Sequence, residues 1–273
     1  MSSVASILKQ HTGNNDHNER NQSQSDVLGC PGARAFVLHY TPQKETIFNS
    51  SRTRHRFSMM EGSRVDDYLS AFVETGWTDL EHACDRVFWA ELQAMDKCAC
   101  AAYRIRLHLL RTGFVATDTQ LRATAYGLSP ILDLVGFYPS GAIGIVEIKC
   151  GEHANATVST GPMLVPFHQI ACSGRTICLL QLAVQFVCLK QCLAVASLKA
   201  GTEGERPSRF MPSKEIQPRN SHLLIYSLMD SDTSANHSNS SGTSKTPSFP
   251  FKIRMHPLPP ALPDLVEMNL ADL

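Results

Sequence analysis

Hydrophobic positions along this chain follow two periods, one typical of helices and one typical of strands. Residues 63–75 carry apolar side chains three and four positions apart, which predicts an amphipathic helix. The same spacing over residues 79–113 predicts one long helix or two, ending at Gly113. Residues 178–197 are apolar with few interruptions and predict a helix buried in the core.

Shorter apolar runs bounded by turn residues predict strands. They lie at residues 114–127, 129–141 (a strand with its turn), 142–151, 221–230 and 251–259. Pro139, Ser140 and Gly141 are the turn residues between the second and third runs. The order of helices, three strands, a helix and two further strands predicts a mixed α/β plan with one sheet.

Polar stretches divide the chain into regions. Residues 13–26 have almost nothing to bury and predict disorder. Residues 201–220 are irregular, and residues 230–248 have the low complexity of a flexible loop. We therefore expect a disordered tail at residues 1–32, a main domain at 33–228 with its core motifs at 62–197, a flexible loop at 229–249, and a C-terminal strand and tail at 250–273.

Charge and composition narrow the function classes. Lys+Arg and Asp+Glu both number 25, so the formal net charge is zero, and 43% of residues are hydrophobic, enough for a sizeable core. A strongly basic composition would directly indicate nucleic-acid binding, and this chain does not have one. It leaves room for a local basic patch on a neutral protein.

Cysteine usage and hydropathy bear on location. Nine cysteines, an odd number spread through apolar stretches, argue against a disulfide framework. We therefore expect an intracellular protein with reduced thiols, with the nucleus and the mitochondrion both open. We expect no membrane partner, because Gln181, Gln185 and Lys190 interrupt residues 177–198, the longest apolar stretch.

Charged residues interrupt two of the predicted core strands. Glu147 and Lys149 lie two apart at the end of one strand, so their side chains share a face. Asp133 lies within an apolar run of the preceding strand, where an unpaired carboxylate is costly to bury. A hairpin between the two strands would bring the acids together at one end of the sheet.

Converging carboxylates repel each other unless a cation lies between them. Oxygen ligands in such an arrangement suit Mg²⁺ or Mn²⁺. Lys149, beside the two acids, could then orient or polarise a water for attack on phosphorus. The chemistry predicted is metal-assisted hydrolysis of a phosphodiester.

Asp133 followed by Glu147-Ile148-Lys149 resembles the signature of the PD-(D/E)xK nuclease superfamily. More narrowly, "ILDLVG…GIVEIKCG" is similar to the RecB-like and lambda-exonuclease-like branch. That branch has an Asp-bearing strand, a hairpin and an acid-x-Lys-x-Gly strand. Gln181 lies on the following helix, where the branch carries its helical Gln, and "EGSRVDDYL" resembles the upstream Gly-x-x-x-His helix motif.

The resemblance implies a restriction-endonuclease-like mixed sheet flanked by helices, and it assigns roles to residues. Asp133 and Glu147 would bind Mg²⁺ or Mn²⁺, with the main-chain carbonyl of Ile148 as a third ligand. Lys149 would position the nucleophilic water. Gln181 would help to hold the active site or the DNA.

The upstream motif and the helical Gln motif both depart from the branch pattern. Gly62 would open the first helix, but Asp66 stands at the position expected for His. A carboxylate can still bind a metal, so Asp66 is included as a candidate ligand. The Tyr often found four residues beyond the helical Gln is Gln185 in this chain.

Less specific interpretations of these residues remain open. Glu147 and Lys149 alone would be a charge pair on a solvated strand end. Asp66 would be an acid at the start of a helix, where the helix dipole stabilises its negative charge. Asp67 is a competing candidate for the metal role. Gln181 alone would be an ordinary polar interruption of a core helix.

Some RecB-like nucleases hold an iron–sulfur cluster with four cysteines, three of them after the nuclease core. The sequence has no compact C-terminal cysteine triplet. It has two closely spaced cysteine pairs instead, Cys98 with Cys100 and Cys188 with Cys192. We therefore expect no iron–sulfur cluster and interpret these cysteines as small core residues. Histidines at zinc-ligand spacing are also lacking, so we expect no zinc site.

Arginines offer candidate contacts to DNA phosphates. Arg104, Arg106 and Arg111 in "YRIRLHLLR" are expected on the solvated side of a helix. Arg175, expected in the loop before the 178–197 helix, is the better candidate, because loops near a site meet the substrate.

Together these features predict a Mg²⁺-dependent DNA nuclease, a hydrolase acting on phosphodiester bonds. The preferred form is an exonuclease in DNA repair, recombination or replication. One alternative is a catalytically silent nuclease fold that binds DNA or protein. The other is a structure-specific endonuclease of the same superfamily.

Overall fold

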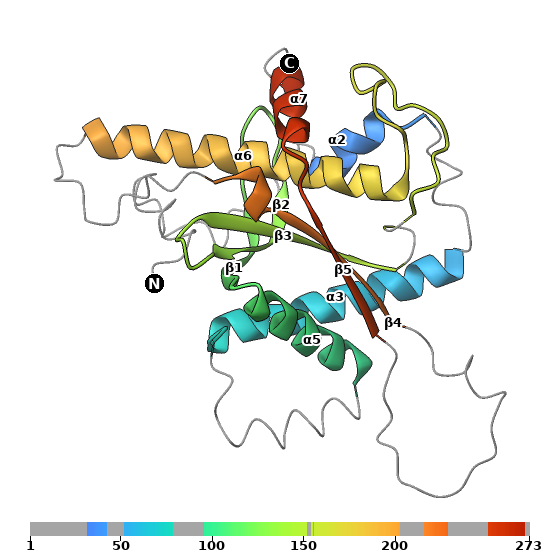
Figure 1. Cartoon of the computed structure of the whole chain (residues 1–273), viewed down its shortest axis with the longest axis vertical. Coiled ribbons are helices and arrows are strands. Elements are labelled where there is room, and N and C mark those ends of the chain that lie inside the picture. The colour runs from blue at the N-terminus through green and yellow to red at the C-terminus, as the bar shows by residue number, and fades with distance from the viewer. Residues whose placement is uncertain are drawn as a thin grey trace, which may run out of the picture.

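The computed structural model describes residues 32–42, 52–78, 96–151, 154, 156–202, 216–228 and 251–270. At its centre is a five-stranded mixed sheet with helices packed against it (Figure 1). Most of the tail predicted at 1–32, the loop predicted at 229–249 and residues 79–95 of the predicted long helix lie outside the described residues. The mixed α/β plan with one sheet is confirmed.

The five strands follow one another across the sheet in chain order, β1-β2-β3-β4-β5. Neighbours are antiparallel except for β3 and β4, which are parallel and are connected through a long helix. The predicted runs are confirmed as strands, with narrower limits. Their bounds are Val115–Arg122 (β1), Ile131–Phe137 (β2), Ile143–Cys150 (β3), His222–Leu228 (β4) and Phe251–Pro257 (β5).

Helices cover both faces of the sheet (Figure 1). One face carries α2 (Ala33–His39), α6 (Gly174–Thr202) and α7 (Ala261–Leu270), and the other carries α3 (Arg52–Thr75) and α5 (Lys97–Arg111). A short 3-10 helix, Pro218–Asn220, precedes β4. The sequence pattern predicted neither α2 nor α7, because both are too short to show several helical repeats.

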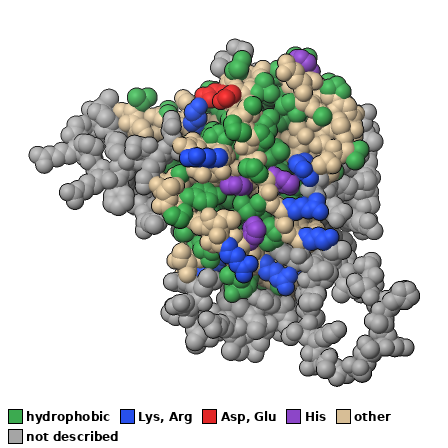
Figure 2. Space-filling model, in the orientation of Figure 1, with side chains coloured by type: hydrophobic (Ala, Val, Ile, Leu, Met, Phe, Trp, Pro, Cys, Tyr) green, Lys and Arg blue, Asp and Glu red, His purple; other side chains and the backbone are tan. Residues whose placement is uncertain are grey.

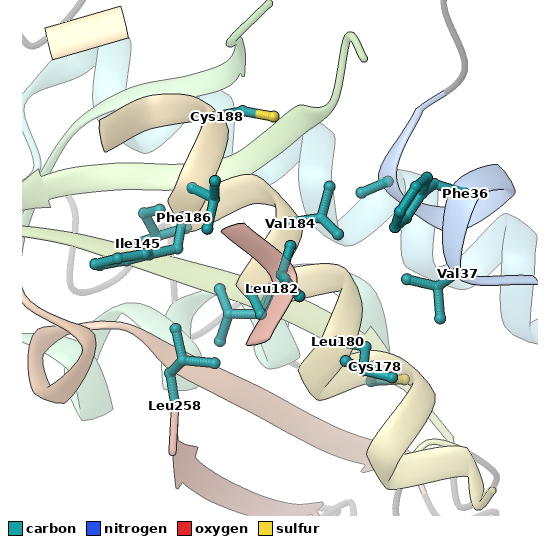
Figure 3. Close-up of a cluster of buried hydrophobic side chains, with 14 of the residues drawn as sticks. Phe36, Val37, Ile145, Cys178, Leu180, Leu182, Val184, Phe186, Cys188 and Leu258 are labelled. Atoms are coloured by element: carbon teal, nitrogen blue, oxygen red, sulfur yellow. The ribbon is translucent and has the colours of Figure 1, made fainter. Parts of the chain in front are cut away.

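Two hydrophobic cores lie on opposite sides of the sheet. The core around α6 is drawn in Figure 3, where Leu180, Leu182, Val184 and Phe186 of α6 lie among side chains of α2, β3 and the segment after β5. Helix α6 contacts the sheet, α2 and α7, so it buries side chains in several directions. This explains why it is apolar around most of its circumference.

Helix α6 also meets the length and composition of a membrane span over Gly174–Leu198. Gln181, Gln185 and Lys190 therefore do not interrupt the stretch enough to exclude a membrane span by composition. Most of this stretch is buried inside the protein, which is the pattern of a core helix.

The predicted helix starts differ from the observed ones. Helix α3 begins at Arg52, so Gly62 lies inside the helix and does not open it, contrary to the expectation from the upstream motif. Helix α6 begins at Gly174, because the Ser173 hydroxyl accepts a hydrogen bond from the main-chain N–H of Thr176 at 3.2 Å. Arg175 is therefore in the first turn of α6 and not in a loop before it.

Arg106 is buried, contrary to the expectation that it lies on the solvated side of its helix. Its guanidinium donates to the carbonyl oxygens of Trp77 at 2.8 Å and Gly76 at 2.9 Å, and lies 4.7 Å from the ring centre of Phe72. It thereby satisfies carbonyls at the end of α3 and holds α3 against α5. Arg106 therefore stabilises the fold and does not face a DNA backbone.

We expect Arg106→Met to lower the free energy of unfolding by about 2–4 kcal/mol, because two carbonyls lose their charged donor. Arg111→Met is the matched control, since Arg111 is exposed at the end of the same helix. Its expected effect is below about 0.5 kcal/mol. Urea unfolding of both variants makes the comparison, and equal effects would contradict the structural role of Arg106.

Candidate active site

Strands β2 and β3 are paired along only part of their length. Their register runs from Phe137↔Ile143 to Leu134↔Val146 and stops there. Beyond this point the main-chain N–H of Ile148 donates to Oδ2 of Asp133 at 2.8 Å. A side-chain carboxylate thus replaces the carbonyl that continued pairing would offer, and Asp133 is fixed beside the end of β3.

Glu147 and Lys149 lie together on the face of β3 that α6 covers. The side chain of Glu147 is buried, with 3% exposure, and its Oε1 forms an ion pair with the ammonium of half-buried Lys149. The amide of Gln185, on α6, donates to Oε2 of Glu147 at 2.6 Å and to the carbonyl of Ile131 at 3.0 Å. Gln185 therefore ties Glu147 to the beginning of β2.

Asp66 approaches the same place from α3. Val65 and Leu69 are buried in the core between α3 and the sheet, which fixes the rotation of the helix. Arg64 forms an ion pair with Asp96, and the hydroxyl of Tyr68 donates to Asp96 at 2.8 Å, which holds α3 to the start of α5.

The pKa values show that these groups act on one another. Burial raises the pKa of Asp66 to about 6, with nearby Lys149 lowering it and Glu147 raising it. Burial also raises the pKa of Asp133 well above its ordinary value; Glu147 and Asp66 raise it further, and Lys149 lowers it. The three acids thus lie within electrostatic reach of one another and of a single lysine.

Lys149 stays charged in this setting. Burial lowers its pKa, but Glu147 and Asp133 raise it by more, so the pKa of Lys149 lies above its ordinary value. The ammonium balances one of the three carboxylates. The remaining negative charge favours either protonation of an acid or a bound cation.

Part of this arrangement fits a divalent metal ion. Asp133 uses Oδ2 for its hydrogen bond, and no described residue donates to its Oδ1, which leaves an oxygen for a hard cation. Both oxygens of Glu147, however, already have protein partners. In the described part of the chain, no three His, Cys, Asp or Glu side chains form a ready metal-binding group. A cation here would need Lys149 to release Glu147.

The structure brings together Asp66, Asp133, Glu147 and Lys149. Helix α3 begins fourteen residues before Asp66, so the interpretation of Asp66 as a helix-start acid is wrong. Asp67, the competing candidate, is exposed.

Gln181 is buried on α6 one turn before Gln185, and no described contact joins its side chain to the four charged groups. Sequence reasoning did not assign a role to Gln185. The signal was its position four residues after Gln181, which places both amides on one side of an otherwise apolar helix. Cys178, another turn earlier, also faces the site, and burial raises the pKa of its thiol to about 11.

No family model matches the chain, and no curated protein is found to be similar to it. A function is therefore inferred from the residues themselves and their geometry.

We expect Asp66→Asn to raise the free energy of unfolding at pH 8 by about 1–2 kcal/mol, in EDTA. The folded-state pKa of Asp66, about 6, lies above the unfolded value of 3.8. Its contribution to stability is therefore present below about pH 4 and is lost as the pH rises through 6. The difference in unfolding free energy between Asp66→Asn and the wild type should therefore shrink as the pH falls from about 6 to about 4.

Urea unfolding between pH 4 and pH 8 measures this difference. Asp67→Asn is the matched control, because the neighbouring acid is exposed. An Asp66→Asn effect that is independent of pH would contradict the raised pKa.

Proposed function

We propose that this chain is a metal-dependent nuclease that hydrolyses the phosphodiester bonds of DNA, with an exonuclease as its preferred form. The observation that carries the proposal is the convergence of Asp66, Asp133, Glu147 and Lys149 at the point where β2 and β3 separate. These residues come from three elements, helix α3 and the two consecutive strands β2 and β3. A structural charge pair would need only two of them.

The arrangement of elements supports the proposed resemblance to the PD-(D/E)xK superfamily. Helix α3 carries Asp66, β2 carries Asp133, a hairpin follows, β3 carries Glu147 and Lys149, and α6 carries the amides. This is the order that the resemblance implies. The restriction-endonuclease-like class is part of the proposal, beyond the mixed α/β sheet itself.

In the proposed mechanism, Asp133 and Glu147 would hold Mg²⁺ or Mn²⁺ with the carbonyl of Ile148, and Asp66 would add negative charge beside them. The bound ion would stabilise the charge that develops on the phosphoryl oxygens. Because Lys149 is protonated, it acts as a hydrogen-bond donor to the attacking water or the phosphate and not as the general base.

Gln185 maintains the geometry of the site. It holds Oε2 of Glu147 while Lys149 exchanges its contact with Oε1 for the substrate. We infer that Gln185 performs the holding role that the resemblance assigns to Gln181.

A second candidate function is a nuclease fold that binds DNA or protein without cleaving DNA. It is favoured by one observation, that both oxygens of Glu147 are engaged by Lys149 and Gln185. Such a protein would retain DNA but show no metal-dependent turnover.

We expect the full chain to degrade linear DNA in Mg²⁺ or Mn²⁺ and to lose this activity in EDTA. Lys149→Ala and Asp133→Asn should each lower the rate at least about 100-fold, because the first removes a donor to the water or the phosphate and the second removes a proposed ligand of the metal ion. Lys190→Ala is the control, since Lys190 lies on α6 in an exposed ion pair with Glu267.

Closed circular DNA tested in parallel separates an exonuclease from an endonuclease. Equal rates for the wild type and Lys149→Ala would exclude the proposed mechanism. DNA retention without cleavage by the wild type would favour the silent alternative.

We expect Gln185→Leu to lower cleavage about 10- to 100-fold, because it removes the only described amide donor to Glu147. Gln181→Leu, the matched control one turn away, should have a smaller effect. Initial rates measured under the same conditions make the comparison, with circular dichroism to confirm folding. A larger loss for Gln181→Leu would assign the holding role to Gln181.

A further inference from the structure

Strand β5 forms an edge of the sheet and presents basic side chains on one face. Lys252, Arg254 and His256 alternate along it, so all three point to the same side. Ile253 and Met255 point to the opposite side, into the core around α3 and α5.

The register places these basic residues on the same face of the sheet as the candidate active site. Glu147 pairs with Leu223, which pairs with His256. In the next row, Lys149 pairs with Ile225, which pairs with Arg254. Since neighbouring strands lie about 4.8 Å apart, the basic row runs on the order of 10 Å from Glu147 and Lys149.

Arg175 extends this row from the adjoining helix. It lies in the first turn of α6, close enough to His256 for its charge to act on the imidazole. Three residues later on α6, Cys178 lies within electrostatic reach of Lys149 and Glu147. The start of α6 therefore joins the basic row to the active site.

The charges of Lys252 and Arg254 are not paired with acids of the described residues. Both side chains are exposed. Figure 2 shows Lys, Arg and His side chains gathered over β5 and the start of α6, while the Asp and Glu side chains visible on this face form one small group near α7. A neutral protein thus has a locally basic surface.

His256 lies at the end of this row, and part of its ring is withdrawn from solvent. Its Nε2 is buried and has no hydrogen-bond partner among the described residues. Burial lowers the pKa of His256, and Arg175 and Arg254 lower it further, so the imidazole is neutral at pH 7.

We propose that Lys252, Arg254 and His256, with Arg175, bind the phosphate backbone of the DNA whose scissile bond lies at Glu147 and Lys149. This inference rests on the proposed function. One strand of duplex DNA carries a charge about every 3.4 Å along the axis. A row on the order of 10 Å from the reacting bond would therefore lie within reach of phosphates close to the scissile one on the same strand.

The test is a binding measurement that does not depend on cleavage. Fluorescence anisotropy of an end-labelled DNA duplex with the full chain, in EDTA, gives the Kd at several salt concentrations. We expect the double variant Lys252→Gln, Arg254→Gln to raise the Kd at least about tenfold. The slope of log Kd against log salt should fall by about 2, because the variant has two fewer cations to neutralise phosphates.

A control with the same change in charge is Arg111→Gln combined with Lys190→Gln. Arg111 lies near the turn between β2 and β3, because Gly113 packs on Pro139, and this is the other end of β3 from Lys149. This double variant should bind DNA as the wild type does. Urea unfolding confirms that both double variants are folded.

The outcomes separate this inference from the proposed function. If the wild type binds DNA tightly and the β5 double variant matches the control, the inference is overturned, whatever the cleavage assay shows. If the β5 variant binds weakly and the wild type binds well but does not cleave, the role of the basic surface is supported and the nuclease proposal fails.

With an active enzyme, the β5 variant should raise KM and leave kcat within about twofold, since its residues do not touch the reacting phosphate. Wild type that binds no DNA would overturn the inference.

Discussion

The arrangement of the site depends on one local constraint, the end of pairing between β2 and β3 after Leu134↔Val146. A main-chain N–H at this depth needs an acceptor, and Asp133 supplies it to Ile148. The same bond that satisfies the backbone holds a carboxylate in the gap between the strands. Continued pairing would close that gap and separate Asp66 from the acids of the sheet.

Much of the strand order could be predicted from sequence, because apolar runs and turn residues are local signals. The pairing of Asp133 with the end of β3 followed from the hairpin, since one short turn fixes which residues face each other. The start of α3 and the existence of α2 and α7 could not be predicted. The resemblance implied that Gly62 opens the first helix, yet the helix begins ten residues earlier, at Arg52, and continues through the glycine.

Roles that depend on contacts between distant elements were the least predictable. Arg106 looks like a surface residue, because its apolar neighbours occupy the inward positions, but the end of α3 supplies two carbonyls for its guanidinium. Gln185 looks like a departure from a family pattern, and only the crossing of α6 over β3 shows that it bonds Glu147. In both cases the partner is absent from the local sequence.

The neutral total charge conceals two opposite local fields. Three carboxylates near one lysine would repel a polyanion, and burial makes that repulsion stronger than it would be in water. The exposed cations of β5 lie about one Debye length away at physiological salt, far enough that they do not neutralise the acids. A nucleic acid drawn to the basic row would therefore reach the acids only if a cation accompanied it or was already bound. In the proposed function, access of a bound backbone to the acids would thus depend on the metal ion, which a neutral composition alone would not suggest.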